Sequence, residues 1–334
     1  MNGMRYLLVL SWLALSGVAA AEVYELPPEG NDVVGALTVI RARSDDTLIE
    51  IARRHGLGYE DIVRANPEVD TWLPGEGTEV VLPTRYVLPP GPRRGLILNL
   101  AEYRLYYFPE AGAGETPLVM TYPISIGRMD WETPLGRTSV IAKVTDPAWY
   151  PPASVRAEHA AAGDPLPRIV PAGPDNPLGR HAMRLGLPSY LIHGTNRPAG
   201  VGMRVSHGCI RMFPEDIAYL FDEVGIDTPV RIINVPVKMG WNGDELLVEV
   251  HEPLEVSASA VDASAIDVAI EAVAAAPVVR DKMTYLTEQF VVATNARPGE
   301  LDWDIAEELL GRADGIPAAV GRQIKDAATS AASE

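Results

Sequence analysis

Apolar and polar positions near the N-terminus alternate in a way that predicts a small unit of two strands and two helices. Leu48, Ile51 and Ala52 recur at helical spacing and therefore share one face. Thr47 stands just before them and Glu50 three residues later, which is the capping-box pattern that starts a helix. The expected order is strand, helix, helix and strand, at residues 37–40, 47–56, 59–66 and 78–83.

Short apolar runs separated by Gly, Pro, Asn and Asp clusters fill the middle of the chain, and such runs are typical of strands. Only residues 214–224 have a firm helical pattern there, with Pro214 and two acidic residues at the start. The pattern predicts a β-rich α+β domain over residues 95–235. Its expected strands are Leu96–Leu98, Arg104–Phe108, Leu118–Tyr122, Thr138–Ile141, Tyr190–Ile192 and Val230–Asn234.

The best domain boundary is the segment 85–94, whose prolines and glycine predict a stiff linker. It separates an N-terminal unit at 37–84 from the β-rich domain. The residues before the unit, 22–36, are acidic and are expected to be an extended lead-in.

From residue 236 the chain changes character. Leu246–Val250 predicts a strand and Asp302–Leu310 an amphipathic helix, while the alanine-rich segment Ser257–Ala276 predicts a helix or partial disorder. Residues 252–334 hold 15 acidic and 6 basic side chains. A solvated appendage is therefore expected for this acidic C-terminal extension, 236–334, with a protein-docking surface as the alternative.

The first 21 residues have the pattern of a cleaved signal peptide. Arg5 supplies a positive start, Tyr6–Ala20 is apolar but short for a membrane span, and Ala19–Ala21 offers small residues for cleavage. We therefore expect an exported, periplasmic protein without a permanent membrane anchor.

The formal net charge of −17 argues against nucleic-acid binding, which needs a basic surface. The chain has a single cysteine, Cys209. Exported proteins usually pair their cysteines, so one unpaired thiol indicates an intermolecular link or a reactive group.

Cys209 has the surroundings of a nucleophile. His193 lies sixteen residues before it, His207 lies two before it, and glycines separate them. A thiolate attacks carbonyl carbon well, and a neighbouring imidazole can accept its proton. Two other interpretations are a small core cysteine and a zinc site. The polar, glycine-rich setting disfavours the first, and a lone cysteine with six scattered histidines disfavours the second.

The segments His193-Gly194-Thr195 and Ser206-His207-Gly208-Cys209-Ile210-Arg211-Met212 resemble the active-site signature of L,D-transpeptidases, the YkuD domain, over residues from about 95 to 234. The resemblance implies a mixed, curved β-sheet fold, with Cys209 as nucleophile and His193 as general base. It implies that the Gly194 carbonyl orients His193, and that His207 and Gly208 shape the site. From its position two residues before Cys209, His207 remains the competing base. No metal and no cofactor is called for.

Five further residues are candidates for binding substrate. Arg211 could pair with a carboxylate or form a structural salt bridge, and Thr195 and Ser206 are the polar residues at the facing ends of the two signature segments. Trp149 and Tyr150 offer flat contact surfaces in a loop, or form a hydrophobic plug there.

The strand–helix–helix–strand unit at 37–84 resembles a LysM domain, a family that binds N-acetylglucosamine glycans. Asp45 stands where that family usually has glycine, and a small packing domain without sugar affinity is the alternative.

The whole arrangement resembles enzymes that attach an outer-membrane lipoprotein to peptidoglycan through a C-terminal lysine. The acceptor stays open between that lysine, a second peptide stem and water. The rival reading is a non-catalytic LysM protein that binds peptidoglycan.

Overall fold

The computed structural model describes residues 22–128, 131–254 and 281–324. The expected signal peptide, 1–21, and the whole of the alanine-rich segment Ser257–Ala276 lie outside the described residues. No helix within the described ranges is long and apolar enough to cross a membrane.

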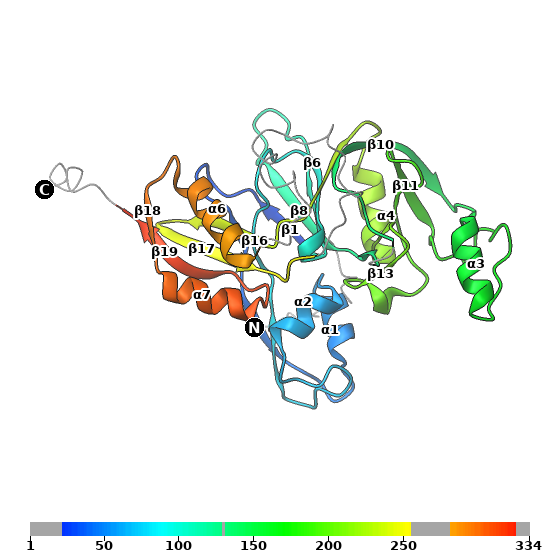
Figure 1. Cartoon of the computed structure of the whole chain (residues 1–334), viewed down its shortest axis with the longest axis horizontal. Helices are drawn as coiled ribbons and strands as arrows, with labels where there is room; N and C mark the ends of the chain where they lie inside the picture. The colour runs from blue at the N-terminus through cyan, green and yellow to red at the C-terminus, as the bar shows by residue number, and fades with distance from the viewer. Residues whose placement is uncertain (1–21, 129–130, 255–280, 325–334) are drawn as a thin grey trace, which may run out of the picture.

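A mixed, curved sheet of nine strands forms the centre of the molecule, and this confirms the β-rich α+β prediction (Figure 1). Two neighbouring pairs in it are parallel, β6–β15 and β12–β14, and the others are antiparallel. The sheet turns at β10, which pairs with β15 over its first half and with β11 over its second, with a register shift after Val140. In sheet order the strands are β1 (Glu22–Glu25), β8 (Leu118–Pro123), β7 (Arg104–Phe108), β6 (Gly95–Asn99), β15 (Pro229–Ile233), β10 (Gly136–Thr145), β11 (His181–Leu185), β12 (Leu191–His193) and β14 (Ile210–Arg211).

Both faces of the central strands are buried, because alternate side chains enter different cores. On β6, Leu96 and Leu98 belong to the main core, whereas Ile97 belongs to a second core on the opposite face. Helix α4 (Pro214–Glu223) covers the main core with Ile217 and Leu220. It follows the nucleophile segment directly, so packing of α4 fixes where that segment ends.

The N-terminal unit has the expected order of strand, helix, helix and strand. β3 (Thr38–Arg41) pairs with β4 (Glu79–Leu82), and α1 (Leu48–Arg54) and α2 (Tyr59–Ala65) lie between them in the chain. The predicted capping box is present: the Glu50 amide donates to Thr47 Oγ1 at 3.1 Å, and the Thr47 amide donates to the Glu50 carboxylate at 3.2 Å.

The segment 85–94 is not a free linker. Residues Arg85–Val87 form β5, which pairs with β2 (Val33–Gly35), and Val87 and Leu88 are buried. The Val87 amide donates to the Glu249 carboxylate at 2.7 Å. Composition predicted stiffness, but the apolar residues inside the segment hold it between neighbouring domains.

The C-terminal extension is a packed domain, and the prediction of a solvated appendage was wrong for its described part. Its four-stranded sheet packs against two helices around Trp241, Val248 and Leu309. The expected strand and amphipathic helix are both present. The elements are β16 (Val237–Asn242), β17 (Glu245–Val250), α6 (Lys282–Thr294), β18 (Gly299–Leu301), α7 (Trp303–Arg312) and β19 (Ala318–Gln323).

Candidate active site

The sheet itself brings the two halves of the signature together. β12 and β14 run parallel, with Ile192 opposite Ile210 and His193 opposite Arg211. Both isoleucines are buried in the main core. Because side chains alternate along a strand, His193 and Arg211 lie on the other face of this pair. Cys209 immediately precedes β14, so it enters the same region next to the start of β12.

His193 is buried and held in one orientation. Its side chain is 4% exposed, and Nδ1 lies 2.6 Å from the Gly194 carbonyl oxygen. That contact assigns the proton of the neutral ring to Nδ1, which leaves Nε2 as the acceptor. Burial and, to a smaller extent, the Arg211 charge together lower the pKa of His193 to about 3, although backbone hydrogen bonds at Gly194 and Leu178 oppose the shift. The imidazole is therefore neutral at ordinary pH, with a lone pair on Nε2.

Cys209 is a free, partly exposed thiol. Its Sγ donates to the Ser189 carbonyl at 3.5 Å. Burial raises the pKa of the thiol, while a backbone hydrogen bond at Leu191 and the Arg211 charge act in the opposite direction. The resting pair is thus a neutral thiol and a neutral imidazole.

The turn before Cys209 is fixed by its own backbone and by a threonine from a distant loop. Gly208 has φ +97°, a conformation that favours glycine, and a Cβ there would lie 3.0 Å from the Tyr190 ring. Thr133 Oγ1 donates to the Gly208 carbonyl at 2.9 Å and accepts from the Gly127 amide at 3.1 Å. Ser206 Oγ donates to the Cys209 carbonyl.

His207 makes its contacts with another element. Its Nε2 lies 3.1 Å from the Glu158 carboxylate on α3 (Ala153–Ala161), and Arg128 contacts both groups. The Trp131 ring meets the His207 ring edge-on at 5.2 Å between centroids. These contacts explain the position of the His207 side chain, and none of them requires His207 to act as the base.

The predicted substrate-binding residues differ in what they contact. The Arg211 side chain is half-buried, forms no ion pair with the described residues, and its Nε has no hydrogen-bond partner among them. Thr195 Oγ1 accepts from the Arg197 amide, so Thr195 and Ser206 both brace the backbone. Trp149 bridges to Val170 through backbone hydrogen bonds, and Tyr150 is 66% exposed.

Comparison with known proteins shows the family of the chain. The family model for the YkuD L,D-transpeptidase catalytic domain matches residues 93–232. A relative from Salmonella typhimurium named probable L,D-transpeptidase ErfK/SrfK is 39% identical over 309 residues, which cover 91% of this chain and 93% of the relative. The chain belongs to the L,D-transpeptidase family. Two relatives from Escherichia coli, named probable L,D-transpeptidases YbiS and YcfS, are 42% and 43% identical, each over 72% of this chain and over 78% and 76% of their own lengths.

Several site residues of this L,D-transpeptidase chain were not found by sequence reasoning. Thr133, Arg128, Glu158 and Trp131 all support the Ser206–Cys209 turn or His207 from segments that are distant in sequence. Helix α3, which carries Glu158, was not among the predicted elements. These residues form no motif, so no local signal marks them.

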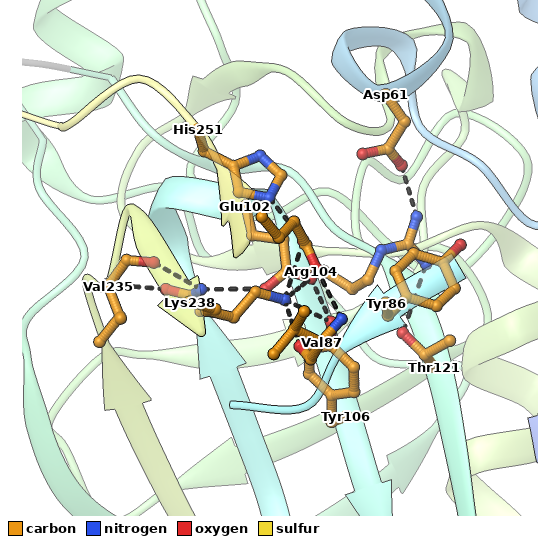
Figure 2. A network of polar contacts seen from close by, with 12 residues as sticks. Asp61, Tyr86, Val87, Glu102, Arg104, Tyr106, Thr121, Val235, Lys238 and His251 are labelled. Atoms are coloured by element: carbon orange, nitrogen blue, oxygen red, sulfur yellow. Dashed lines mark hydrogen bonds and ion pairs between the residues drawn. The ribbon is translucent and has the colours of Figure 1, made fainter. Parts of the chain in front are cut away.

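One buried group has donor atoms suited to a metal, namely Glu102, Glu249 and His251, whose ligand atoms lie within 4.8 Å of one another. The ammonium of Lys238 lies among them, and Figure 2 shows the Lys238 side chain next to Glu102. It is 2.7 Å from Glu102 and 2.9 Å from Glu249. Lys238 therefore supplies the positive charge that a metal would provide, and the group is a buried ion-pair network.

Proposed function

We propose that this L,D-transpeptidase acts in the periplasm by acyl transfer from peptidoglycan, with Cys209 as nucleophile. The Cys209 sulfur attacks the carbonyl carbon at the L-centre of the third residue of a tetrapeptide stem, and His193 accepts the thiol proton. The proton then goes to the nitrogen of the terminal D-alanine as the C–N bond breaks, which leaves a thioester on Cys209. An amine attacks the thioester, and the thiol regains its proton through His193.

The observation that carries this proposal is the state of His193. The contact of Nδ1 with the Gly194 carbonyl orients the buried ring, and its lowered pKa keeps it neutral, so its Nε2 lone pair is free to act as the base. Such a base needs a third group to fix its tautomer, and here a backbone carbonyl takes the place that a carboxylate takes in other triads. Because Cys209 starts as a thiol, proton transfer accompanies attack rather than preceding it.

The oxyanion formed during attack needs donors close to Cys209. We assign this role to backbone amides of the turn Ser206–Cys209, which Thr133 and Ser206 hold in shape. Removing one donor of such a hole typically raises the barrier by about 3 kcal/mol. Gly208 contributes its unusual backbone angle, and His207 holds the outer side of the turn.

Arg211 is proposed to bind a carboxylate of the donor stem. The Arg211 guanidinium is half-buried and has no ion-pair partner among the described residues, so nothing offsets the cost of burying its charge until an anion binds. The charge that acts on it most strongly is that of Arg197, which is also positive. Arg211→Ala is expected to raise the donor KM by roughly 10- to 100-fold, the range for a hydrogen bond to a charged group. Steady-state kinetics would measure it, with Arg211→Lys as the matched variant that keeps the charge and loses the bidentate geometry. An unchanged KM in Arg211→Ala would remove this role.

The LysM-like unit is proposed to bind the glycan strand. Its loop after α2 exposes Trp72 and Leu73, 62% and 79% exposed, with their amides held by Asp70. An exposed indole is a suitable surface for stacking on a sugar ring. Trp72→Ala is expected to weaken binding to purified sacculi several-fold in a pelleting assay. If Trp72→Ala binds as well as the unaltered protein, the unit is a packing domain or uses another surface.

The acceptor is proposed to be the C-terminal lysine of an outer-membrane lipoprotein, or the amine of a second stem in a 3–3 cross-link. Intact mass spectrometry of the mature protein with tetrapeptide muropeptide, and with both acceptor peptides in competition, tests this. A thioester adduct that is absent in Cys209→Ala, followed by one dominant product, would support the transferase and identify the acceptor. Release of tripeptide alone would indicate a hydrolase. No adduct, with binding to sacculi intact, would favour a non-catalytic LysM protein.

A further inference from the structure

The N-terminal unit touches the active-site segment directly. The first turn of α2 meets the loop between His193 and Cys209: the Tyr59 amide donates to the Val201 carbonyl at 3.0 Å, and the Glu60 amide to the Gly202 carbonyl at 3.4 Å. Figure 1 shows α1 and α2 beside β13 (Arg204–Ser206), the strand that leads into the nucleophile turn. Helix N-termini leave amides unsatisfied, so these two carbonyls complete α2 while α2 fixes the loop.

Two glycines make this approach possible. A Cβ on Gly58 would lie 2.7 Å from the Gly202 Cα, and a Cβ on Gly202 would lie 2.4 Å from the Tyr59 nitrogen. Gly58 has φ −88°, which any residue can adopt, so space alone requires glycine there. The two backbones are therefore in van der Waals contact, closer than any pair of side-chain-bearing residues would allow.

The N-terminal unit makes a second contact with the segment that follows Cys209. Arg53 of α1 forms a bidentate pair with Glu215 at 2.7 and 2.9 Å, and its guanidinium lies 5.5 Å from the centre of the Phe213 ring. Glu215 and Phe213 stand at the start of α4, within six residues of Cys209. Bidentate arginine–carboxylate pairs fix orientation as well as distance.

A buried ion pair anchors the same unit to the central sheet. Arg104 of β7 is fully buried and pairs with Asp61 of α2, as Figure 2 shows. Asp61 also accepts from the Gly58 amide at 2.8 Å, so the anchor extends to the glycine contact. The unit is thus docked rigidly rather than tethered.

We propose that the LysM-like unit is a positioning element of the active site, in addition to any glycan that it binds. It holds the loop before Cys209 through α2 and the helix after Cys209 through Arg53. Apart from this unit, that loop is tied to the Ser125 hydroxyl, which donates to the Gly200 carbonyl, and to β9 (Ile126–Gly127), which pairs with β13. This inference rests on the proposed acylation of Cys209.

The test measures acylation of Cys209 by a tetrapeptide that carries no glycan, so that sugar binding does not contribute. Gly58→Ala is expected to lower the acylation rate constant about 10- to 100-fold with little change in KM, because a displacement of about 1 Å at the nucleophile is enough for such a loss. Gly77→Ala is the matched control: Gly77 lies in the same unit, has φ +81°, and a Cβ there meets no atom within 4 Å. It strains the unit without touching the catalytic domain, so it is expected to retain the acylation rate.

A charge exchange provides a second, independent test. Arg53→Glu alone is expected to slow acylation, and the double variant Arg53→Glu with Glu215→Arg is expected to recover most of the rate, since the pair is restored with the opposite polarity. Wild-type acylation rates in Gly58→Ala, equal losses in Gly58→Ala and Gly77→Ala, or no recovery in the double variant would each overturn the inference. Absence of an adduct in the unaltered protein would instead refute the proposed function, so the two failures are distinguishable.

Discussion

Replacing His193 with alanine is expected to lower the rate of Cys209 acylation by roughly 10²- to 10⁴-fold, the usual contribution of a general base. The thiol has a raised pKa and is protonated at rest, so attack requires a proton acceptor. The His193 ring is buried, oriented by the Gly194 carbonyl and neutral at ordinary pH. The rate of thioester adduct formation at pH 7, followed by intact mass, measures the effect.

His207→Ala is the matched control for that prediction. The His207 side chain contacts Glu158, Arg128 and Trp131, so its removal loosens the outer side of the turn and leaves the base in place. A measurable acylation rate is expected to remain. A larger loss in His207→Ala than in His193→Ala would reverse the assignment of the base.

The pKa of His193 also predicts how acylation depends on pH. A base with a pKa of about 3 does not become protonated between pH 7 and pH 5, so the donor kcat/KM is expected to show no loss from His193 in that range. Arg211→Ala removes the second cause of the lowered pKa and is expected to move the acid limb of the profile toward higher pH. An acid limb near pH 6.5 in the unaltered protein would mean that a solvated histidine is the base.

The sequence indicated the strand that carries His193 and the turn that carries Cys209, because both lie in one continuous stretch. The apolar run that ends at Ile192 predicts a buried strand, and the glycines around Cys209 predict turns, so His193 and Cys209 could be proposed as partners before the fold was known, whereas the short strand at Ile210 was not predicted. Local patterns carry this information because strand alternation and turn geometry depend on neighbouring residues.

The supporting contacts could not be predicted because they come from distant segments. Thr133 and Glu158 reach the nucleophile turn from different parts of the fold, and nothing near them in sequence indicates a partner. Composition misled in two places for a related reason. Residues 85–94 pack because neighbouring elements cover apolar positions such as Val87, and the acidic C-terminal region packs around its own apolar residues, such as Trp241.

Substitution of Asp216 by asparagine is expected to stabilise the protein at pH 8 and to have little effect near pH 4. Asp216 lies in the first turn of α4 and is 5% exposed, and its Oδ2 has no hydrogen-bond partner among the described residues. Burial raises the pKa of this carboxyl to about 8, and the Glu215 carboxylate adds to the rise, while Arg104 and Arg53 oppose it. The folded protein therefore keeps a proton that the unfolded chain releases near pH 3.8.

The sign of the pH dependence follows from that difference. Between about pH 4 and pH 8 the folded state binds more protons than the unfolded state, so this group makes the free energy of unfolding fall as pH rises. One unit of pKa corresponds to about 1.4 kcal/mol, so the accumulated loss by pH 8 is on the order of several kcal/mol. Asparagine stays neutral, so Asp216→Asn removes this group's contribution to the pH dependence of the free energy of unfolding.

Thermal unfolding of the unaltered protein and of Asp216→Asn at several pH values tests this prediction. Asp222→Asn is the control, because Asp222 lies exposed on the same helix. The stability difference between Asp216→Asn and the unaltered protein could instead stay constant from pH 4 to pH 8. That result would show that Asp216 is ionised in the folded state. Helix α4 would then begin with a buried negative charge beside the nucleophile segment.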